Sequence, residues 1–549
     1  MNLAAEAFRR QEAGDWAGAE ALYRQLLDAE PDNPDHFYNF GIVCKNTGRF
    51  GDAVACQRRA LELRPDFPEA ANNVGTALLG LGQIDAAVAA FRQAVGLRPA
   101  FPEAWNNLGS ALKFLGRVEE AIPCLETAVR LQPDRPAFLS NLIYALHYCP
   151  GQPPAALLAA ARRWQRAFGG PVPLPPMPAD RSIERRVKVG YVSATFHDHC
   201  QSFFTIPLFA HHDHRQFEIF AYADGRVADS VTARIRGSVD QWRAIAGRTD
   251  PEVAELIRAD GIDVLVDLNV HSAPPRLGVF ALRPAPVQVS WLGYPGTTGL
   301  DAIDYRLTDR FLDPPGASDG AYAEESYRLP DSFWCYDPLT AGPAVNPLPA
   351  LSRGRIAFGC LNNFCKVNEP VLRLWGQVLR AVPDSTLRVM APAGSARTGL
   401  AGRLGVAEDR VEFCEFAPRP EYLERYHHID LGLDTFPYNG HTTNFDALWM
   451  GVPVVSLCGE TAVSRAGLSL LAHLGLRELV ATEPAEFVRI AVELAGNRPR
   501  LADLRATLRD RLVGSPLMDA RAFARGVEAA YLQFWRRAGR SPTAPVSRR

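Results

Sequence analysis

The chain has 549 residues, 47% hydrophobic and 22% charged, with a formal net charge of −2 and ten cysteines. The length predicts about three or four globular domains, and the near-neutral charge argues against bulk attraction to nucleic acid or membranes. No apolar run approaches the roughly 18 residues of a membrane span, the N-terminus lacks a signal segment, and no two cysteines form a CxxC pair. We therefore expect a cytoplasmic protein with mostly reduced cysteines, no nucleic-acid partner and no membrane association.

Residues 1–146 carry an internal repeat of 34 residues. The positions with this spacing are Gly14, Gly48, Gly82 and Gly116; Ala19, Ala53, Ala87 and Ala121; and Pro31, Pro65, Pro99 and Pro133. In each unit the glycine would end a first helix, and the alanine would let a second helix pack closely against it. The period and these small residues are typical of tetratricopeptide (TPR) repeats, so the sequence predicts an α-helical TPR solenoid.

One more column follows the same period, and its members are Asn39, Asn73, Asn107 and Asn141. Each lies in the first helix of its unit, where asparagine is a mediocre helix former. An amide has both a donor and an acceptor, so such a column could bind the backbone of an extended peptide. The alternative is that each asparagine only satisfies local backbone groups. We favour binding of protein or peptide acceptors.

Residues 147–186 form a linker, with a helix predicted in "YCPGQPPAALLAAARRWQRAF" and a proline-rich connector in "GGPVPLPPMPADRS". At the other end of the chain, residues 537–549 are rich in proline, serine and arginine and predict a disordered tail.

Between these ends, short β-rich runs alternate with helical stretches. Residues 187–350 contain "VKVGYVS", "FEIFAYA", "IDVLVDL" and "PVQVSWLG", and residues 351–536 contain "RIAFGCL", "STLRVMA", "RVEFCEF", "IDLGLDT" and "VPVVSLC". The alternation indicates parallel sheets with crossover helices, and the two sets predict two doubly wound, Rossmann-like α/β domains. Ligands of such sheets bind outside the carboxyl ends of the strands.

Residues 434–460, "DTFPYNGHTTNFDALWMGVPVVSLCGE", lie at such a position. An apolar run ends at Asp434, and Gly440, His441, Thr442 and Thr443 precede a helical pattern. Backbone N–H groups at the start of that helix would suit an anion. We find no P-loop, GxGxxG or DxD pattern. A diphosphate here would therefore be met by helix N-termini and basic side chains, with no required metal or other cofactor.

The repeats, the two α/β halves and this segment together resemble the O-GlcNAc transferase family, including its bacterial SPINDLY-like members. The segments that carry the resemblance are "VKVGYVSATFHDH", "FALRPAPVQVSWLGYPGTTG", "FGCLNNFCK" and "DTFPYNGHTTNFDALWMGVPVVSLCGETAVSR". The resemblance covers nearly the whole chain and implies a GT-B fold. It also implies an inverting, metal-independent transferase that moves N-acetylglucosamine from UDP-GlcNAc to Ser or Thr hydroxyls of proteins.

Site residues follow from the same resemblance. His441, Thr442 and Thr443 would meet the diphosphate, Asp446 the ribose, and Lys366 would neutralise the departing diphosphate. The other donor-site residues would be Asn363 beside Lys366, Ala417, Arg419 and Tyr422 around the nucleoside, and Leu292, Gly293 and Tyr294 at the sugar. Each of these roles has a purely structural alternative. Thr442 could cap an ordinary helix, Lys366 could be solvated at the surface and Tyr422 could belong to the core. Leu292, Gly293 and Tyr294 could form a plain turn after a strand.

His199 in "SATFHDHC" matches a family histidine near the acceptor and the donor sugar, and we carry it as the candidate base. The family aspartate four residues earlier is Thr195 here, and threonine cannot take a proton at neutral pH. A proton relayed toward the phosphate is the alternative. A zinc site built from the dense histidines His197 to His214 fits no pattern of closed zinc sites, and His211 to His214 are better explained as a surface turn.

Two other functions remain open. Plant SPINDLY proteins are similar and use GDP-fucose, but their nucleotide segment tends to read GTTTT, whereas this chain reads GHTT followed by Asn-Phe-Asp. The second is a repeat-based adaptor with a decayed transferase half, which the retained Lys366, His441 and Asp446 argue against.

Overall fold

The structure is a computed structural model and describes residues 3–170, 182, 184–272 and 275–538. Most of the proline-rich connector and of the predicted tail lie outside these residues. The chain divides into two compact units. Unit 1 holds the repeats up to Ala145 together with Asn363–Asn368 and Ala391–Leu400, and unit 2 holds the remainder.

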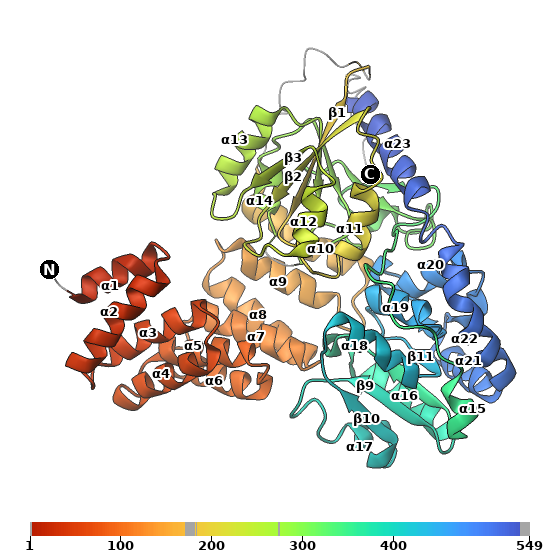
Figure 1. Cartoon of the computed structure of the whole chain (residues 1–549), viewed down its shortest axis with the longest axis horizontal. Helices are drawn as coiled ribbons and strands as arrows, with labels where there is room; N and C mark the ends of the chain where they lie inside the picture. Colours follow the sequence, from red (N-terminus) through yellow and green to blue (C-terminus); the bar gives the residue numbers. More distant parts are fainter. Residues whose placement is uncertain (1–2, 171–181, 183, 273–274, 539–549) are drawn as a thin grey trace. The chain divides into compact units, whose positions relative to one another are not determined.

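Unit 1 is built mainly from helix pairs that stack in succession (Figure 1). The helices are α1 (Leu3–Glu12), α2 (Trp16–Ala29), α3 (Pro34–Asn46), α4 (Phe50–Leu63), α5 (Pro68–Gly80), α6 (Ile84–Leu97), α7 (Pro102–Phe114) and α8 (Val118–Leu131), followed by α9 (Pro136–Leu146). The four turn glycines have φ from +71° to +78°, a region that glycine adopts without steric cost. The four period alanines are at most 1% exposed. The predicted TPR solenoid is therefore confirmed.

Unit 2 contains two sheets in which every strand pair is parallel. The first has the order β3-β2-β1-β4-β5-β6-β7, with β1 (Val187–Ser193), β2 (Phe217–Ala223), β3 (Gln241–Ala244), β4 (Val264–Asp267), β5 (Val287–Ser290), β6 (Tyr305–Thr308) and β7 (Glu325–Arg328). The second has the order β10-β9-β8-β11-β12-β13, with β8 (Ala357–Cys360), β9 (Thr386–Met390), β10 (Val411–Cys414), β11 (Leu431–Leu433), β12 (Val454–Leu457) and β13 (Val480–Ala481).

Helices connect and cover these strands. They are α10 (Pro154–Phe168), α11 (Ser202–Phe209), α12 (Ser230–Arg236), α13 (Asp250–Asp260), α14 (Leu277–Ala281), α15 (Pro349–Arg353), α16 (Glu369–Ala381), α17 (Leu400–Leu404), α18 (Arg419–Glu424), α19 (Thr442–Trp449), α20 (Ala466–His473), α21 (Pro484–Gly496), α22 (Arg498–Val513) and α23 (Ala520–Ala538). The two Rossmann-like sheets confirm the predicted fold class. All nine strands predicted from apolar runs are present.

Four strands were not predicted: β3, β6, β7 and β13. Three of them lie at sheet edges, and β3 and β7 carry partly exposed polar side chains instead of an apolar run. The fourth, β6, is buried but includes Arg306, whose guanidinium donates to Asp313 at 2.6 Å. A buried arginine that is paired with a carboxylate seven positions further along interrupts the apolar run by which a strand is recognised.

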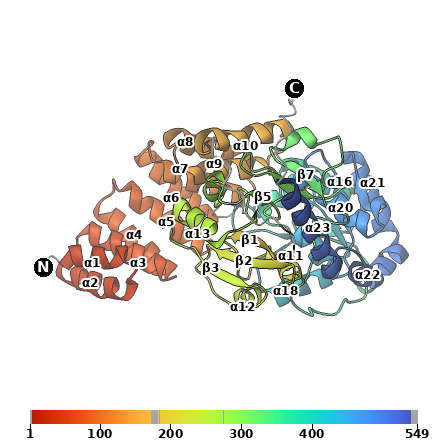
Figure 2. The same cartoon turned by 90° about the horizontal axis from the view of Figure 1, so that it is seen from above.

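The last helix, α23, packs on the first sheet although it follows the second sheet in sequence (Figure 2). Phe534 stacks on Tyr305 of β6 with ring centroids 3.8 Å apart, and Phe523 lies 5.8 Å from Trp291. Most of α23 falls in residues 351–536, the range predicted for the second α/β domain, and its aromatic face packs against the first sheet. Among the described residues, no helix is both long and apolar enough to span a bilayer.

Candidate functional site

The turn between β11 and α19 is organised by one buried carboxylate, that of Asp434. Its Oδ1 accepts from the backbone N–H groups of Gly440 at 2.7 Å and Thr435 at 2.8 Å. Its Oδ2 accepts from Asn444 Nδ2 at 2.8 Å and Ser456 Oγ at 2.6 Å. Burial raises the pKa of Asp434, and these donors oppose the shift. Four hydrogen bonds to one side chain hold the turn in a single conformation.

Gly440 is required by close packing inside this turn. A Cβ at this position would lie 2.2 Å from Asn444 Oδ1 and 3.0 Å from Asn362 Oδ1. The Gly440 N–H donates to Asp434, so packing and hydrogen bonding inside the turn both fix this position.

The first turn of α19 presents backbone donors. The described part of the chain shows no acceptor for the N–H of Thr442 or Thr443, and both residues are half-exposed. Thr442 is the first helical residue, and the preceding His441 makes no side-chain capping bond, so the helix capped by Thr442 is not observed. The His441 ring lies against Trp334 and Tyr438, with centroids 5.4 and 4.9 Å away. The arrangement suits an anion at the positive end of the helix dipole.

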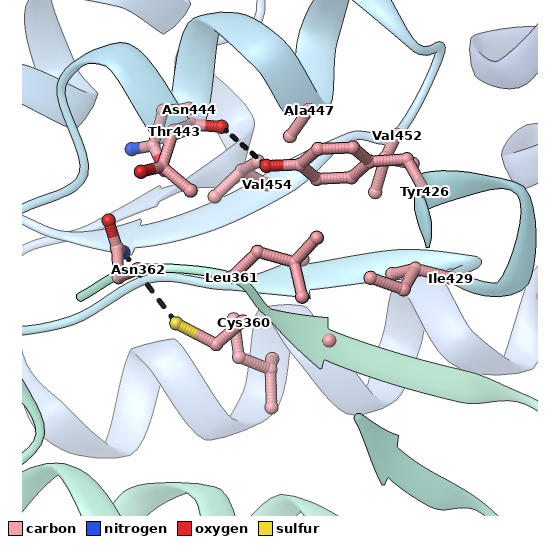
Figure 3. A pocket seen from close by; sticks show the side chains of 13 residues that line it. Cys360, Leu361, Asn362, Tyr426, Ile429, Thr443, Asn444, Ala447, Val452 and Val454 are labelled. Carbon is pink, nitrogen blue, oxygen red and sulfur yellow. Dashed lines mark hydrogen bonds between the residues drawn. The ribbon is translucent and has the colours of Figure 1, made fainter. Parts of the chain in front are cut away.

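A small cavity of about 20 Å³ lies beside this turn, between the ends of β8 and β11 and the first turns of α19. Figure 3 shows the polar side chains of Asn362, Thr443 and Asn444 at one end and apolar side chains at the other. The Tyr426 hydroxyl donates to the Thr443 carbonyl at 3.1 Å (Figure 3). The volume holds about one water molecule, so the cavity is part of the packing around α19 and not a nucleotide pocket.

Arg419, Asp446 and Tyr336 form a buried polar cluster next to α19. Arg419 Nη2 donates to Asp446 Oδ1 at 2.7 Å and to the Tyr336 hydroxyl at 2.8 Å, and that hydroxyl donates to Asp446 Oδ1 at 2.6 Å. Burial alone would lower the pKa of Arg419, but the charge and hydrogen bond of Asp446 raise it. The guanidinium lies 4.2 Å from the centroid of the Phe203 ring, which α11 supplies from the side of the first sheet.

This cluster changes how Asp446 fits the site. Alone, its carboxylate would repel a phosphate, but the paired Arg419 cancels that charge. Arg419 and Tyr336 both contact Oδ1, so a ribose hydroxyl would share that oxygen or approach the other one. Tyr336 was missed by the sequence analysis, because a tyrosine about 110 positions from Asp446 carries no local signal.

Tyr422 is partly buried, and its hydroxyl lies 2.9 Å from that of Tyr426, which in turn donates to Thr443. Burial raises the pKa of Tyr422, so the group stays neutral. Ala417, before α18, is 6% exposed. The structure thus brings Ala417, Arg419 and Tyr422 of α18 and its preceding loop next to the start of α19.

At the carboxyl edge of the first sheet, the backbone after β4 and β5 is strained. Leu292 has φ +77° at the centre of a three-residue turn closed by the Gly293 N–H and the Trp291 carbonyl at 3.1 Å. A Cβ at Gly293 would lie 2.4 Å from the Asn269 carbonyl oxygen, and the neighbouring Val270 has φ +52°. Strain of this kind persists where the surrounding structure over-determines it, often at functional sites. A plain strand-exit turn would not need it.

Tyr294 is 2% exposed, and its ring lies 4.6 Å from that of His147 in the linker. The following Thr297 and Thr298 donate to the buried Glu324, at 2.7 Å from Thr297 Oγ1 and 2.7 Å from the Thr298 N–H. Glu324 therefore anchors the loop that carries Leu292, Gly293 and Tyr294. The sequence analysis missed this residue.

The environment of His199 bears on its role. The Gln201 N–H donates to His199 Nδ1 at 3.3 Å, which places the ring proton on Nε2. Burial, with a smaller contribution from His197, lowers the pKa of His199 to about 4. The imidazole is therefore neutral at pH 7 and presents an N–H donor, which favours a hydrogen-bonding role over that of a general base.

Thr195, where the family aspartate would stand, is 7% exposed and belongs to a hydroxyl network. Its backbone N–H donates to Ser193 Oγ at 3.0 Å, and its hydroxyl donates to Gln201 Oε1. Gln201 Nε2 donates in turn to the Leu268 carbonyl at 2.9 Å. Thr195 thus orders the loop that holds His199.

Asn363 and Lys366 belong to unit 1, in the loop after β8. Asn363 is exposed, and its Oδ1 accepts from the Cys365 N–H at 3.2 Å. Lys366 ends a short 3₁₀ helix, η2 (Phe364–Lys366), and is half-buried.

The asparagine column is half-exposed and takes part in bonds between repeats. Asn107 Nδ2 donates to Asn72 Oδ1 at 2.9 Å, and Asn141 Nδ2 donates to Asn106 Oδ1 at 2.8 Å. Asn39 Nδ2 donates to the Asp35 carbonyl of its own helix at 2.9 Å. Asn73 hydrogen-bonds Tyr38. Asn39 thus bonds a local backbone group, as the alternative predicted, whereas the other three amides bond side chains of a neighbouring repeat. The column lies on a partly open face.

The dense histidines separate in the structure. His212 is buried, with its Nδ1 2.9 Å from Glu528 Oε1 and its Nε2 2.9 Å from the Tyr191 hydroxyl. This corrects the expected surface turn for that residue, because α23 covers it. In the described ranges, no group of three His, Cys, Asp or Glu side chains is placed to hold a metal.

A profile for "Glycosyl transferase family 41" matches residues 176–341 and 348–527. The chain belongs to glycosyl transferase family 41. Residues 2–148 of this family 41 chain also match the "Cilia and flagella-associated protein 70 middle TPR-like domain". The solved structure of a mutant O-GlcNAc transferase from Thermobaculum terrenum is similar, with a TM-score of 0.85 and 37% identity over 92% of this chain and 98% of the other.

Curated plant proteins are also similar to the family 41 chain. One from Petunia hybrida, named "Probable UDP-N-acetylglucosamine--peptide N-acetylglucosaminyltransferase SPINDLY", is 40% identical over 365 residues, which cover 64% of this chain and 39% of the relative. An Arabidopsis thaliana protein with the same description and the name SEC is 31% identical over 382 residues, covering 66% and 39%. The chain thus spans about two fifths of the length of these relatives.

Proposed function

We propose that this chain is an inverting glycosyltransferase that moves N-acetylglucosamine from UDP-GlcNAc to serine or threonine hydroxyls of protein or peptide acceptors. The observation that carries the proposal is the first turn of α19. It offers the N–H groups of Thr442 and Thr443 beside the Arg419–Asp446 pair, at the carboxyl edge of a parallel sheet. Membership of family 41 and the names of the plant relatives support the same donor and acceptor class, and the similar bacterial O-GlcNAc transferase supports the same transferred sugar.

The donor would be held by the following residues. Thr442, Thr443 and His441 meet the diphosphate, and Lys366 stabilises the charge that develops on it as the bond to C1 breaks. Arg419 and Asp446 meet the ribose, with Ala417 and Tyr422 beside the base. The strained turn at Leu292 and Gly293, with Tyr294 behind it, forms a wall for the sugar. A required metal has no role in this scheme, since the cations and helix N–H groups supply the positive charge.

The acceptor would lie along the groove of the repeats, held through the asparagine column. Its hydroxyl oxygen forms the new bond to C1, the bond between C1 and the diphosphate oxygen breaks, and inversion follows from attack opposite the leaving group. The hydroxyl proton passes to the departing phosphate or to solvent, because His199 Nδ1 already accepts a hydrogen bond. His199 donates through Nε2 and orients the reactants. The cytoplasmic location expected from the sequence stays a prediction.

The test is calorimetry of UDP, UDP-GlcNAc and GDP-fucose binding, with and without chelator, followed by mass spectrometry of peptide acceptors. We expect micromolar UDP binding, roughly −7 to −8 kcal/mol, that chelator leaves unchanged. Tighter binding of GDP-fucose, together with fucosylated product, would show that GDP-fucose is the donor and not UDP-GlcNAc. Nucleotide-independent peptide binding with no product from either donor would favour the adaptor function.

A further inference from the structure

One of the four turn glycines in unit 1 differs from the others in what surrounds it. A Cβ added to Gly116 would lie 2.6 Å from the Val367 carbonyl oxygen and 3.1 Å from that of Phe364. A Cβ added to any of the other three would meet no atom within 4 Å, and these three are Gly14, Gly48 and Gly82. Since all four have φ between +71° and +78°, backbone conformation does not explain the difference. The turn after α7 is in direct contact with the loop after β8.

The contacted residues flank Lys366 on both sides. Phe364 and Val367 are 3% and 2% exposed, so both are fixed by packing. The Val367 N–H donates to the Phe364 carbonyl at 2.9 Å, and the Lys366 N–H donates to the Asn363 carbonyl at 3.0 Å. This compact turn transmits any displacement of Phe364 or Val367 to Lys366, because Lys366 lies between them.

A second contact of unit 1 lies at the start of α6. Asp85 Oδ2 accepts from the Ser395 N–H at 2.7 Å, and Ser395 Oγ donates to Asp85 Oδ1. A Cβ at Gly394, which has φ +100°, would lie 2.1 Å from Asp85 Oδ2, so this approach also needs a glycine. Ser395 belongs to the loop after β9, and β9 pairs with β8, whose following loop carries Lys366. Two adjacent loops of the second sheet therefore rest on two consecutive repeats.

We propose that the repeats position the donor-site lysine, with Gly116 and Asp85 as positioning residues that act through Lys366. The proposal rests on the proposed function, because it takes Lys366 as the residue that stabilises the departing diphosphate. The repeats then have a task beyond holding the acceptor. They provide the surface on which the lysine loop is held.

The first test compares Gly116→Ala with Gly48→Ala in the full chain. Both place a side chain at the same repeat position with the same strained φ, but only the first meets the Lys366 loop. We expect Gly116→Ala to lower kcat for transfer about tenfold or more at saturating acceptor, since small misplacements of catalytic groups have large effects. Acceptor KM should stay near the wild-type value in both variants, because neither change touches the asparagine column.

The second test does not depend on the folding of the glycine variants. Asp85→Ala should lower kcat, and Asp85→Asn should restore part of it, because an amide still accepts from the Ser395 N–H. The matched control is Glu119→Ala, which changes the exposed acid at the same position of the next repeat. In a Lys366→Ala background, Asp85→Ala should have no further effect on kcat.

The outcomes separate this proposal from the proposed function. Wild-type transfer by Lys366→Ala would overturn the role of Lys366, and the positioning proposal with it. A strong loss of transfer in Lys366→Ala, combined with equal kcat values for Gly116→Ala and Gly48→Ala and for Asp85→Ala and Glu119→Ala, would overturn the positioning proposal and leave the proposed function standing. A rise in acceptor KM at unchanged kcat would show that Gly116 and Asp85 support only the acceptor groove, which also overturns it.

Discussion

Arg419 and Asp446 form an ion pair of 2.7 Å between Nη2 and Oδ1, with 19% and 2% of their side chains exposed. Asp446→Ala would leave the guanidinium charge buried without its partner, which typically costs about 3–5 kcal/mol of unfolding free energy. We expect that loss in urea denaturation, together with loss of UDP binding in calorimetry. Asp446→Asn should destabilise less, because the amide oxygen still accepts. Glu493→Ala, which breaks the exposed pair with Arg489, is the control and should leave stability nearly unchanged.

Gly440→Ala tests the turn before α19. Because the added Cβ would overlap Asn444 Oδ1, the Asn444 amide must shift and weaken its bond to Asp434, and we expect a loss of about 1–3 kcal/mol in stability. UDP affinity should fall by about tenfold or more, since the donors of Thr442 and Thr443 move with the turn. Gly402→Ala in α17 meets nothing within 4 Å and is the matched control. Unaltered UDP binding in a folded Gly440→Ala protein would separate this turn from the nucleotide site.

His199→Ala should reduce transfer by about 10²-fold while leaving UDP affinity within a few-fold. If Nε2 acts as a donor, His199→Asn should retain more activity than His199→Ala, because its amide can still donate; a general base would lose as much in either variant.

The pH profile provides a separate check on His199. Because its pKa is lowered to about 4, the neutral form persists from alkaline pH down to that value and is lost only as the pH falls through it. Transfer should therefore show no His199-dependent acidic limb near 6.5. Such a limb, present in wild type and absent from His199→Asn, would contradict the buried neutral imidazole.

Changing Asn39, Asn73, Asn107 and Asn141 to alanine should raise acceptor KM about tenfold or more and leave UDP binding unchanged. The structure adds a cost in stability, since two of these amides bond to the neighbouring repeat, at roughly 0.5–1.5 kcal/mol per bond. The double variant Asn72→Ala and Asn106→Ala removes the same two bonds and keeps the column. An equal rise in acceptor KM for the double variant would assign the effect to repeat packing.

Two buried histidines make stability depend on pH. Burial lowers the pKa of His147 to about 3 and that of His271 to about 4. Below about pH 6.5 the unfolded chain therefore binds protons before the folded one, so stability is full above that pH and falls as the pH drops toward 4. His271→Gln, which cannot titrate, should show a smaller fall in Tm between pH 7 and 5. An identical fall in both proteins would contradict the shifted pKa of His271.

Much of the fold could be predicted from local pattern. The 34-residue period predicted the repeats because each repeat packs mainly on its neighbours, so small residues at Ala53 or Ala87 report the packing directly. Strands such as β1 and β12 were predictable because both faces are largely buried and their residues are mostly apolar. The GHTT segment could be recognised as a helix start because Gly440 lies just before Thr442 and Thr443, where the helical pattern begins. The roles of individual site residues carried by the resemblance stay predictions.

Contacts between distant segments were decided only by the tertiary structure. Asp446 was expected at a ribose, but its partners are Arg419 of α18 and Tyr336, which lie 27 and 110 positions away and which no local pattern connects to it. Likewise, α23 covers the first sheet, and Gly116 differs from Gly48 through its contacts with Phe364 and Val367. The sequence by itself determined where helices, strands and repeats form, because the spacing of small, apolar and charged residues along the chain is enough to predict them. Only the tertiary structure decided which of these residues contact one another. The reason is that a polar group loses its water when the sheets and repeats pack, so it must find a specific partner inside the protein.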